Sequence, residues 1–140
     1  MSIWKKPATL EQINKFGANT LVSHLGIEVT AIGDSTISAT MPVADHTRQP
    51  LGYLHGGASV VLAETLGSIA AHLAAEEGMV SFGAEINANH LRSVRSGTVT
   101  GVASPLRIGS SMQVWDIRIT DDNDELICIS RLTAAIRPQP

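Results

Sequence analysis

The sequence predicts an α+β fold in which a mainly antiparallel sheet curls around one long central helix. Three observations lead to this prediction. Apolar residues recur at helical spacing over residues 56–76, strand-like alternation flanks that segment on both sides, and only 4% of the 140 residues are aromatic. A core with so few large rings must be built from aliphatic and small side chains. The length suits one domain, which we expect to span residues 1–140.

A short helix is expected near the N-terminus. Residues 8–17 include Thr9, a good N-cap, and Gln12 stands three positions later, as in a capping box. Gly17 is a residue type at which helices commonly stop. The segment is therefore predicted to be helical and to end at this glycine.

A β-hairpin is expected next. Apolar side chains alternate with polar ones over residues 27–31 and again over residues 37–41. Gly33 and Asp34 lie between the two runs and are typical turn residues. Pro42 cannot donate to a sheet ladder, so the second strand is predicted to end there.

The long helix is predicted from about Gly56 to Glu76. Its larger apolar residues form one continuous stripe at helical spacing: Ala58, Val61, Leu62, Leu66, Ile69, Ala70 and Leu73. The rest of its surface carries small or apolar residues where an exposed helix carries Lys and Glu: Gly57, Val60, Ala63, Gly67, Ala71 and Ala74. We therefore expect the helix to be buried on most sides, by a sheet or by a second subunit.

Further strands are predicted after the helix, in a three- or four-stranded meander. Alternating or extended segments occupy residues 79–91, 98–108, 111–120 and 125–136. Pro105 implies that the second of these segments lies at an edge or contains a bulge. The acidic run at residues 121–124 is expected to be a solvated hairpin loop rather than a calcium site.

Composition and charge exclude several classes of function. The net charge of −3 argues against bulk binding of nucleic acid. The N-terminal residues lack the apolar run of a signal peptide, and no uninterrupted apolar stretch reaches the length of a membrane span. We therefore expect a cytoplasmic protein without a membrane partner. The single cysteine, Cys128, cannot form an intrachain disulfide or a metal cluster, and it is expected to be a buried thiol.

The basic residues are unevenly distributed. No Lys or Arg lies between Arg48 and Arg92, and then Arg92, Arg95 and Arg107 follow within a short segment. This group of arginines suits an anionic ligand, although the protein as a whole is acidic. Ordinary solvated surface arginines are the alternative.

Between Gly56 and Ala75, Glu64 is the only charged residue, and His72 is the only other ionisable side chain. Glu64 lies off the apolar stripe, with Ser68 one turn further on. A carboxylate in such surroundings suits work as a general base or as a nucleophile. A glutamate that reaches solvent or binds a backbone group is the alternative.

The residues at the start of the helix add a candidate site for a polarised carbonyl group. First-turn amides lack partners and carry the positive end of the helix dipole, and Gly56 and Gly57 allow a ligand to approach the backbone. Together with Glu64, these amides suit acyl transfer at a carbonyl carbon. Taken alone, the glycine pair is also typical of a tight turn, His55 of a helix cap, and Gln49 of an ordinary loop.

Two segments, QPLGYLHGGASVVLAETLGS (residues 49–68) and EINANHLRSVRSG (residues 85–97), resemble the hotdog-fold acyl-CoA thioesterases. The resemblance covers nearly the whole chain. It is strongest to the branch that contains the hydrolase of 1,4-dihydroxy-2-naphthoyl-CoA in menaquinone synthesis and the proofreading thioesterase of enterobactin synthesis. It implies a hotdog fold, an acyl-CoA or aroyl-CoA substrate and no separate cofactor. It also implies homodimers with shared active sites, which pair into homotetramers.

The resemblance implies roles for five of the residues discussed above. Glu64 matches the catalytic carboxylate, which acts as a nucleophile or as a general base for water. Gly56 matches the amide that polarises the thioester carbonyl, and His55 and Gln49 match polar residues that orient the thioester. Ser68 matches a hydroxyl near the carboxylate and the attacking water. The family also implies that Gln49 and Glu64 of one site come from opposite subunits.

The resemblance further implies a surface for substrate and CoA, whose phosphates suit arginine partners. The matching positions are Gly83, His90, Leu91, Arg92, Ser93, Arg107, Ile108, Gly109, Ser110, Ser111 and Met112. The acyl group stays open among dihydroxynaphthoyl, hydroxybenzoyl, phenylacetyl and straight-chain groups. A hotdog hydratase or dehydratase, and a non-catalytic acyl-CoA-binding module, are the alternative functions.

Overall fold

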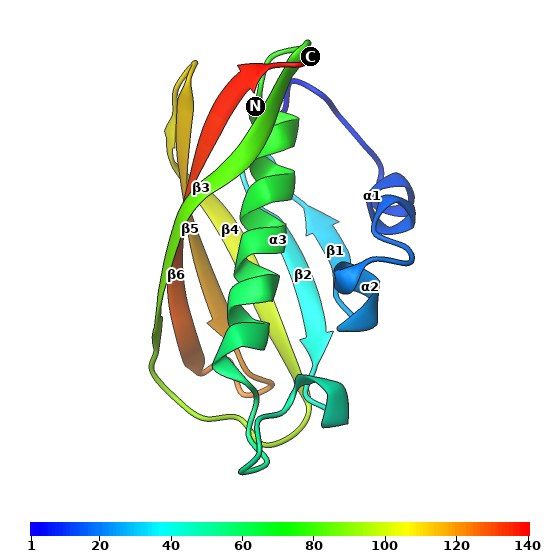
Figure 1. Ribbon diagram of the computed structural model, residues 1–140, viewed down its shortest axis with the longest axis vertical. Helices are drawn as coiled ribbons and strands as arrows, with labels where there is room; N and C mark the ends of the chain where they lie inside the picture. The colour runs from blue at the N-terminus through cyan, green and yellow to red at the C-terminus, as the bar shows by residue number, and fades with distance from the viewer.

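Figure 1 shows the computed structural model, which describes residues 1–140. One antiparallel six-stranded sheet curves around a single long helix, α3, and the strand order is β1-β2-β4-β5-β6-β3. This confirms the predicted α+β architecture. The elements are α1 (Leu10–Phe16), α2 (Leu21–His24), β1 (Glu28–Ile32), β2 (Ile37–Pro42), the 3-10 helix η1 (Asp45–Thr47), α3 (Gly56–Ala74), β3 (Met79–His90), β4 (Thr98–Ile108), β5 (Met112–Thr120) and β6 (Leu126–Pro138).

The elements predicted at the N-terminus are present. Thr9 Oγ1 accepts a hydrogen bond from Gln12 N–H, and Gln12 Oε1 accepts one from Thr9 N–H, so α1 begins with the expected capping box. β1 and β2 pair as the expected antiparallel hairpin. α2, which Thr20 caps, was not predicted, because its four residues are too few to show a periodic pattern.

β3 does not extend the meander of β4, β5 and β6 in chain order, as a four-stranded meander would require. β4, β5 and β6 form a three-stranded meander, but β3 pairs with β6 at the outer edge, from Met79 opposite Pro138 to His90 opposite Cys128. Strand periodicity indicates which side chains share a face, but it does not select a neighbouring strand. Pro105 lies at a bulge in β4, which is an interior strand, so the bulge alternative is confirmed.

Small residues allow α3 to pack closely on the sheet. A Cβ atom on Gly67 would lie 2.6 Å from Leu132 Cδ2, and one on Gly101 would lie 2.7 Å from Leu66 Cδ1. Ten of the 19 residues of α3 are buried, among them Ala63, Gly67, Ala71 and Ala74, so of the two predicted ways to cover the helix, the sheet accounts for this part of its small-residue face. By length and hydropathy alone α3 also matches a membrane span, a test that the core helix of a globular protein passes equally well.

Trp115 is the largest fully buried side chain. Its ring stacks on Trp4, with 6.0 Å between the ring centroids and 10° between the planes. Trp115 Nε1–H donates to Gln113 Oε1 at 2.8 Å, and Gln113 Nε2 donates to the Ala71 carbonyl in α3 at 3.2 Å. These contacts tie the N-terminal segment, β5 and α3 together. Cys128 is also fully buried, as expected, and burial raises the pKa of its thiol.

Trp115→Ala is expected to lower the free energy of unfolding by about 3–5 kcal/mol, because it removes a buried ring and leaves a cavity. Urea denaturation at one fixed protein concentration measures the change. Phe16→Ala is the control, since Phe16 is 92% exposed, and it is expected to change the value by less than about 0.5 kcal/mol. Equal losses in the two variants would show that Trp115 does not anchor the core.

Candidate active site

α3 begins at a cap made by His55. The His55 Nδ1 atom accepts a hydrogen bond from Gly57 N–H at 2.8 Å, and His55 N–H donates to the Thr47 carbonyl at 2.8 Å. The helix-cap interpretation of His55 is therefore confirmed. The amide of Gly56, the first residue of α3, makes no hydrogen bond and is free to bind a carbonyl oxygen.

A cavity of about 350 Å³, called the Gly56 cavity below, opens in front of this amide. Six of the predicted site residues line it: Gln49, Gly56, His90, Leu91, Arg92 and Ser93. The ring of His90, at the end of β3, packs against the start of α3, because a Cβ atom on Gly56 would lie only 2.8 Å from His90 Nε2. Glycine at position 56 therefore lets the imidazole and the free amide share one cavity.

Gln49 brings a hydrogen-bond donor to the Gly56 cavity. Its Oε1 atom accepts a hydrogen bond from Leu51 N–H, so the loop itself holds the carbonyl end of the side chain. Gln49 N–H also donates to the Tyr53 carbonyl at 2.8 Å, which closes the loop. The Nε2 group of Gln49 makes no hydrogen bond within the chain, and it can donate to a ligand in the cavity.

Tyr53 also lines the Gly56 cavity, although the sequence did not identify it as a site residue. The guanidinium carbon of Arg95 lies 4.7 Å from the centre of the Tyr53 ring, and Arg95 Nη2 donates to Tyr53 Oη at 3.0 Å. Arg48 in turn donates to the Arg95 carbonyl at 3.1 Å. Arg92, on the same cavity, pairs with Glu125 at 3.6 Å on the exposed surface. Arg95, which has no acidic partner, thus adds positive charge at this end of the molecule, whereas Glu125 compensates the charge of Arg92.

Glu64 lines a second and larger cavity of about 760 Å³, called the Glu64 cavity below. It lies between α1 and α3, and Ser68 lines it one turn beyond Glu64. The half-buried side chain of Glu64 reaches over β3, since a Cβ atom on Gly83 would lie 2.5 Å from Glu64 Oε2. Only glycine at position 83 leaves room for this carboxylate. The Ser68 hydroxyl makes no hydrogen bond within the chain and is free for water or a ligand.

Residues 51–128, more than half of the chain, match the Thioesterase superfamily. The chain belongs to the thioesterase superfamily. It is 54% identical over 134 residues to the 1,4-dihydroxy-2-naphthoyl-CoA hydrolase of Escherichia coli, a match that covers 96% of this chain and 98% of that protein. A proofreading thioesterase of Cronobacter turicensis is 50% identical, with the same coverage of 96% and 98%.

The structural comparison agrees with the family. The crystal structure of a thioesterase from Haemophilus influenzae has a TM-score of 0.95 to this protein at 53% identity, and the match covers 97% of this chain and 95% of that chain. The predicted family, the hotdog fold and the predicted enzyme class, a thioester hydrolase, are confirmed. The relatives are named as hydrolases and thioesterases, so the family favours an enzyme over the alternative of a non-catalytic acyl-CoA-binding module.

Within one protomer of this thioesterase, the predicted residues fall into two groups. Gly56 and Glu64 lie eight residues apart on α3, roughly 12 Å along the helix axis, and they line different cavities. Gln49 lies with Gly56, whereas Gly83 and Ser68 lie with Glu64. A single chain therefore keeps the unpaired amide and the carboxylate in separate cavities.

The segment from Arg107 to Met112 lies apart from both groups. It contains the turn between β4 and β5, at the end of the molecule where α3 ends, whereas Arg92 and Arg95 lie near the start of α3 (Figure 1). Arg107 lies nine positions beyond Thr98 along β4, which is roughly 30 Å of strand. The expectation that the three arginines form one local cluster is therefore wrong for a single chain, because a long strand carries them apart.

Gly83→Ala is expected to lower kcat/KM for a thioester substrate by about 10²-fold, because the added methyl group displaces the Glu64 carboxylate and a misplacement of about 1 Å has that cost. Thiol release measures the rate. Ala31→Ser changes an exposed position of β1, at the opposite edge of the sheet, by one atom and is expected to keep the wild-type rate. A wild-type rate in Gly83→Ala would show that the carboxylate does not need this space.

Proposed function

We propose that this thioesterase hydrolyses an aroyl-CoA thioester to the free acid and CoA. The observation that carries the proposal is the position of Glu64, whose carboxylate makes no ion pair and lines a cavity of about 760 Å³, a size that suits a small-molecule ligand. The names of two relatives support the reaction class, and one of these is a hydrolase of 1,4-dihydroxy-2-naphthoyl-CoA. A dihydroxynaphthoyl or hydroxybenzoyl group is the proposed acyl group.

In the proposed reaction, the thioester carbonyl oxygen accepts a hydrogen bond from the Gly56 amide, at the positive end of the α3 dipole. Gln49 Nε2 is the second donor. Glu64 either attacks the carbonyl carbon to form a mixed anhydride or takes a proton from the water that attacks it. The C–S bond then breaks, the thiolate of CoA leaves and is protonated, and water supplies the new oxygen of the acid. Ser68 orients that water.

His55 is proposed to act mainly through the helix cap. Its Nδ1 atom holds Gly57 N–H, and this contact leaves the neighbouring Gly56 amide as the unpaired donor of the first turn. His90 packs against the same glycine and is proposed to border the thioester. A change at either imidazole would move the donor relative to the carbonyl group.

We further propose that the working unit is a homodimer with shared active sites. β3 is a 12-residue strand at the edge of the sheet, and Phe82 in β3 is 58% exposed. Long exposed edges are rare in isolated proteins because they pair readily with another strand. Pairing of two β3 strands would complete the sheet, and Glu64 of one protomer would face Gln49 and Gly56 of its partner. Two such dimers are proposed to form the tetramer.

The CoA phosphates are proposed to meet Arg92 and Arg95 beside the Gly56 cavity, since guanidinium groups bind phosphate well. Leu91 and Ser93 would then line the pantetheine path. Arg107 lies too far from these arginines within one chain, so it would reach the same CoA molecule only from another protomer.

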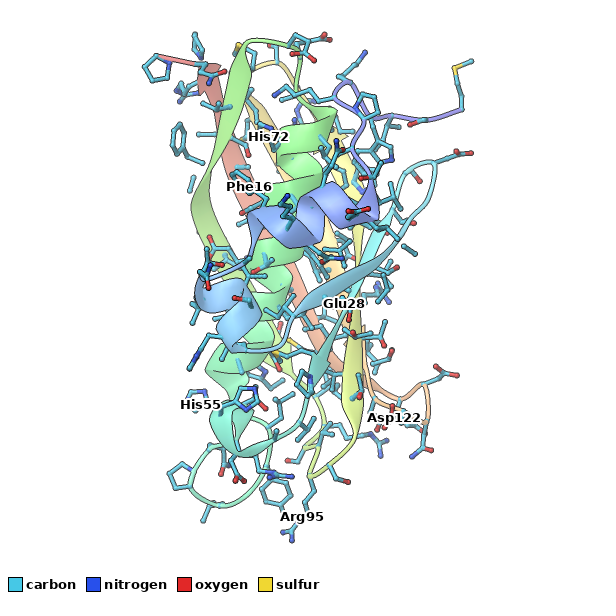
Figure 2. All side chains as sticks on the ribbon, turned by 90° about the vertical axis from the view of Figure 1, so that its right-hand side faces the viewer. Phe16, Glu28, His55, His72, Arg95 and Asp122 are labelled. Carbon is cyan, nitrogen blue, oxygen red and sulfur yellow. The ribbon has the colours of Figure 1, made fainter.

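Glu64→Gln is expected to lower kcat/KM by about 10³-fold or more, because an amide can neither attack the carbonyl group nor accept a proton from water. Thiol release from 1,4-dihydroxy-2-naphthoyl-CoA, 4-hydroxybenzoyl-CoA and a straight-chain acyl-CoA measures the rate and the substrate class together. Glu28→Gln, at an exposed position of β1 (Figure 2), is the matched control and should keep wild-type rates. A fully active Glu64→Gln variant would refute the role of Glu64.

Gln49→Ala and Glu64→Gln are each expected to be nearly inactive alone but to regain activity when mixed. A mixed dimer holds one site with both substitutions and one intact site, so refolding equal amounts together should restore roughly a quarter of the wild-type activity. Each variant refolded alone is the control. If native mass spectrometry detects mixed dimers and activity does not return, each site lies within one protomer.

A further inference from the structure

The Glu64 cavity extends along α3 past the carboxylate, and its far end carries the polar side chains of His72 and Lys6 beside Leu73. Glu64, Ser68 and His72 follow one another at intervals of four residues, so they share one face of α3, and all three line the cavity. His72 lies two turns beyond Glu64, roughly 12 Å along the helix axis. Figure 2 shows His72 toward the C-terminal end of α3, close to α1.

His72 shares this end of the cavity with Lys6. Both side chains line the cavity, and Lys6 Nζ donates to the carbonyl of Met79, the first residue of β3. Burial lowers the pKa of His72, the positive charge of Lys6 lowers it further, and Glu77 opposes the shift. The imidazole is therefore uncharged near pH 7, with one donor and one acceptor nitrogen, and neither nitrogen makes a hydrogen bond within the chain.

Apolar side chains also line the Glu64 cavity: Ala8 just before α1, Ile13 and Phe16 of α1, Val22 of α2, Val29 of β1, and Ile69 and Leu73 of α3. A planar apolar group can lie among them with its thioester at Glu64. His72 is exposed in a single chain, so water is its partner when the cavity is empty. A distal hydroxyl can replace that water with its own hydrogen bond, whereas an apolar distal end cannot.

We propose that the far end of the Glu64 cavity binds a hydroxyl group at the distal end of the acyl group, with His72 as its hydrogen-bond partner and Lys6 beside it. The inference rests on the proposed function, because the thioester must lie at Glu64. An uncharged imidazole can donate to a hydroxyl or accept from it.

The length of the cavity favours an aromatic acyl group. The separation of roughly 12 Å along α3 between Glu64 and His72 includes a contact of about 3 Å at each end, which leaves the length of one or two fused rings. A rigid ring also holds its hydroxyl at a fixed distance from the thioester, whereas an alkyl chain loses rotational freedom on binding. Aroyl thioesters with a hydroxyl opposite the thioester, such as 4-hydroxybenzoyl-CoA, are therefore the preferred substrates, whereas both hydroxyls of a 1,4-dihydroxy-2-naphthoyl group lie on the ring that bears the thioester and would not reach His72.

Two substrate pairs that differ only in the distal hydroxyl test this inference: benzoyl-CoA with 4-hydroxybenzoyl-CoA, and 2-naphthoyl-CoA with 6-hydroxy-2-naphthoyl-CoA. The wild type is expected to prefer the hydroxylated member of at least one pair by about tenfold in kcat/KM, the effect of one hydrogen bond. His72→Phe is expected to abolish this preference by slowing only the hydroxylated substrate. His72→Gln keeps a donor and an acceptor and should retain part of the preference.

His46→Phe and Lys15→Met are the matched controls, because both side chains lie outside the Glu64 cavity, and both variants should keep the preference. Lys6→Met should reduce it in part. An unchanged preference in His72→Phe, or no preference in the wild type, overturns the inference. If the wild type hydrolyses neither these four thioesters nor 1,4-dihydroxy-2-naphthoyl-CoA, the proposed function fails. Equilibrium binding of the same four thioesters then tests the role of His72. If the wild type binds the hydroxylated thioesters more tightly and His72→Phe removes this difference, the hydroxyl site is supported. If the wild type shows no such difference in binding, the inference is overturned.

Discussion

The close contact between α3 and the sheet is the constraint on which the rest of this structure depends. Gly67 lies against Leu132, and Gly101 leaves room for Leu66, so the helix lies nearer to the strands than larger side chains would allow. Once the helix axis is placed, helical geometry sets the direction of every side chain on it. The contacts of Gly67 and Leu66 with the sheet therefore position the Gly56 amide and the Glu64 carboxylate, although neither group takes part in those contacts.

Glycine has a second use at the site itself. Gly56 leaves space for the His90 ring, and Gly83 leaves space for the Glu64 carboxylate; at either position a Cβ atom would displace the neighbouring polar group. Several polar groups on the two cavities, such as the Ser68 hydroxyl, also lack partners within the chain. Unpaired polar groups contribute nothing to folding, but they can bind a ligand without first breaking an internal hydrogen bond.

One helix thus serves both the proposed chemistry and the proposed choice of substrate. The start of α3 supplies the amide, its middle supplies Glu64 and Ser68, and its last turns supply His72. α1 forms the opposite wall of the Glu64 cavity, and its capping box fixes where that wall begins. Changes in α1 can therefore alter the acyl group accepted while the amide and the carboxylate keep their positions on α3.

Local patterns along the chain were sufficient to predict α1, the first hairpin, α3 and the residues at its start, because capping, turn chemistry and periodicity act over a few residues. They were also sufficient to single out Glu64 as a carboxylate on an apolar helix. Only the folded chain shows that β3 pairs with β6, that Arg107 lies far from Arg92, and that His72 shares a cavity with Lys6. These relations join residues distant in sequence, and they depend on which strands and helices meet when the core packs, a choice that no local pattern encodes.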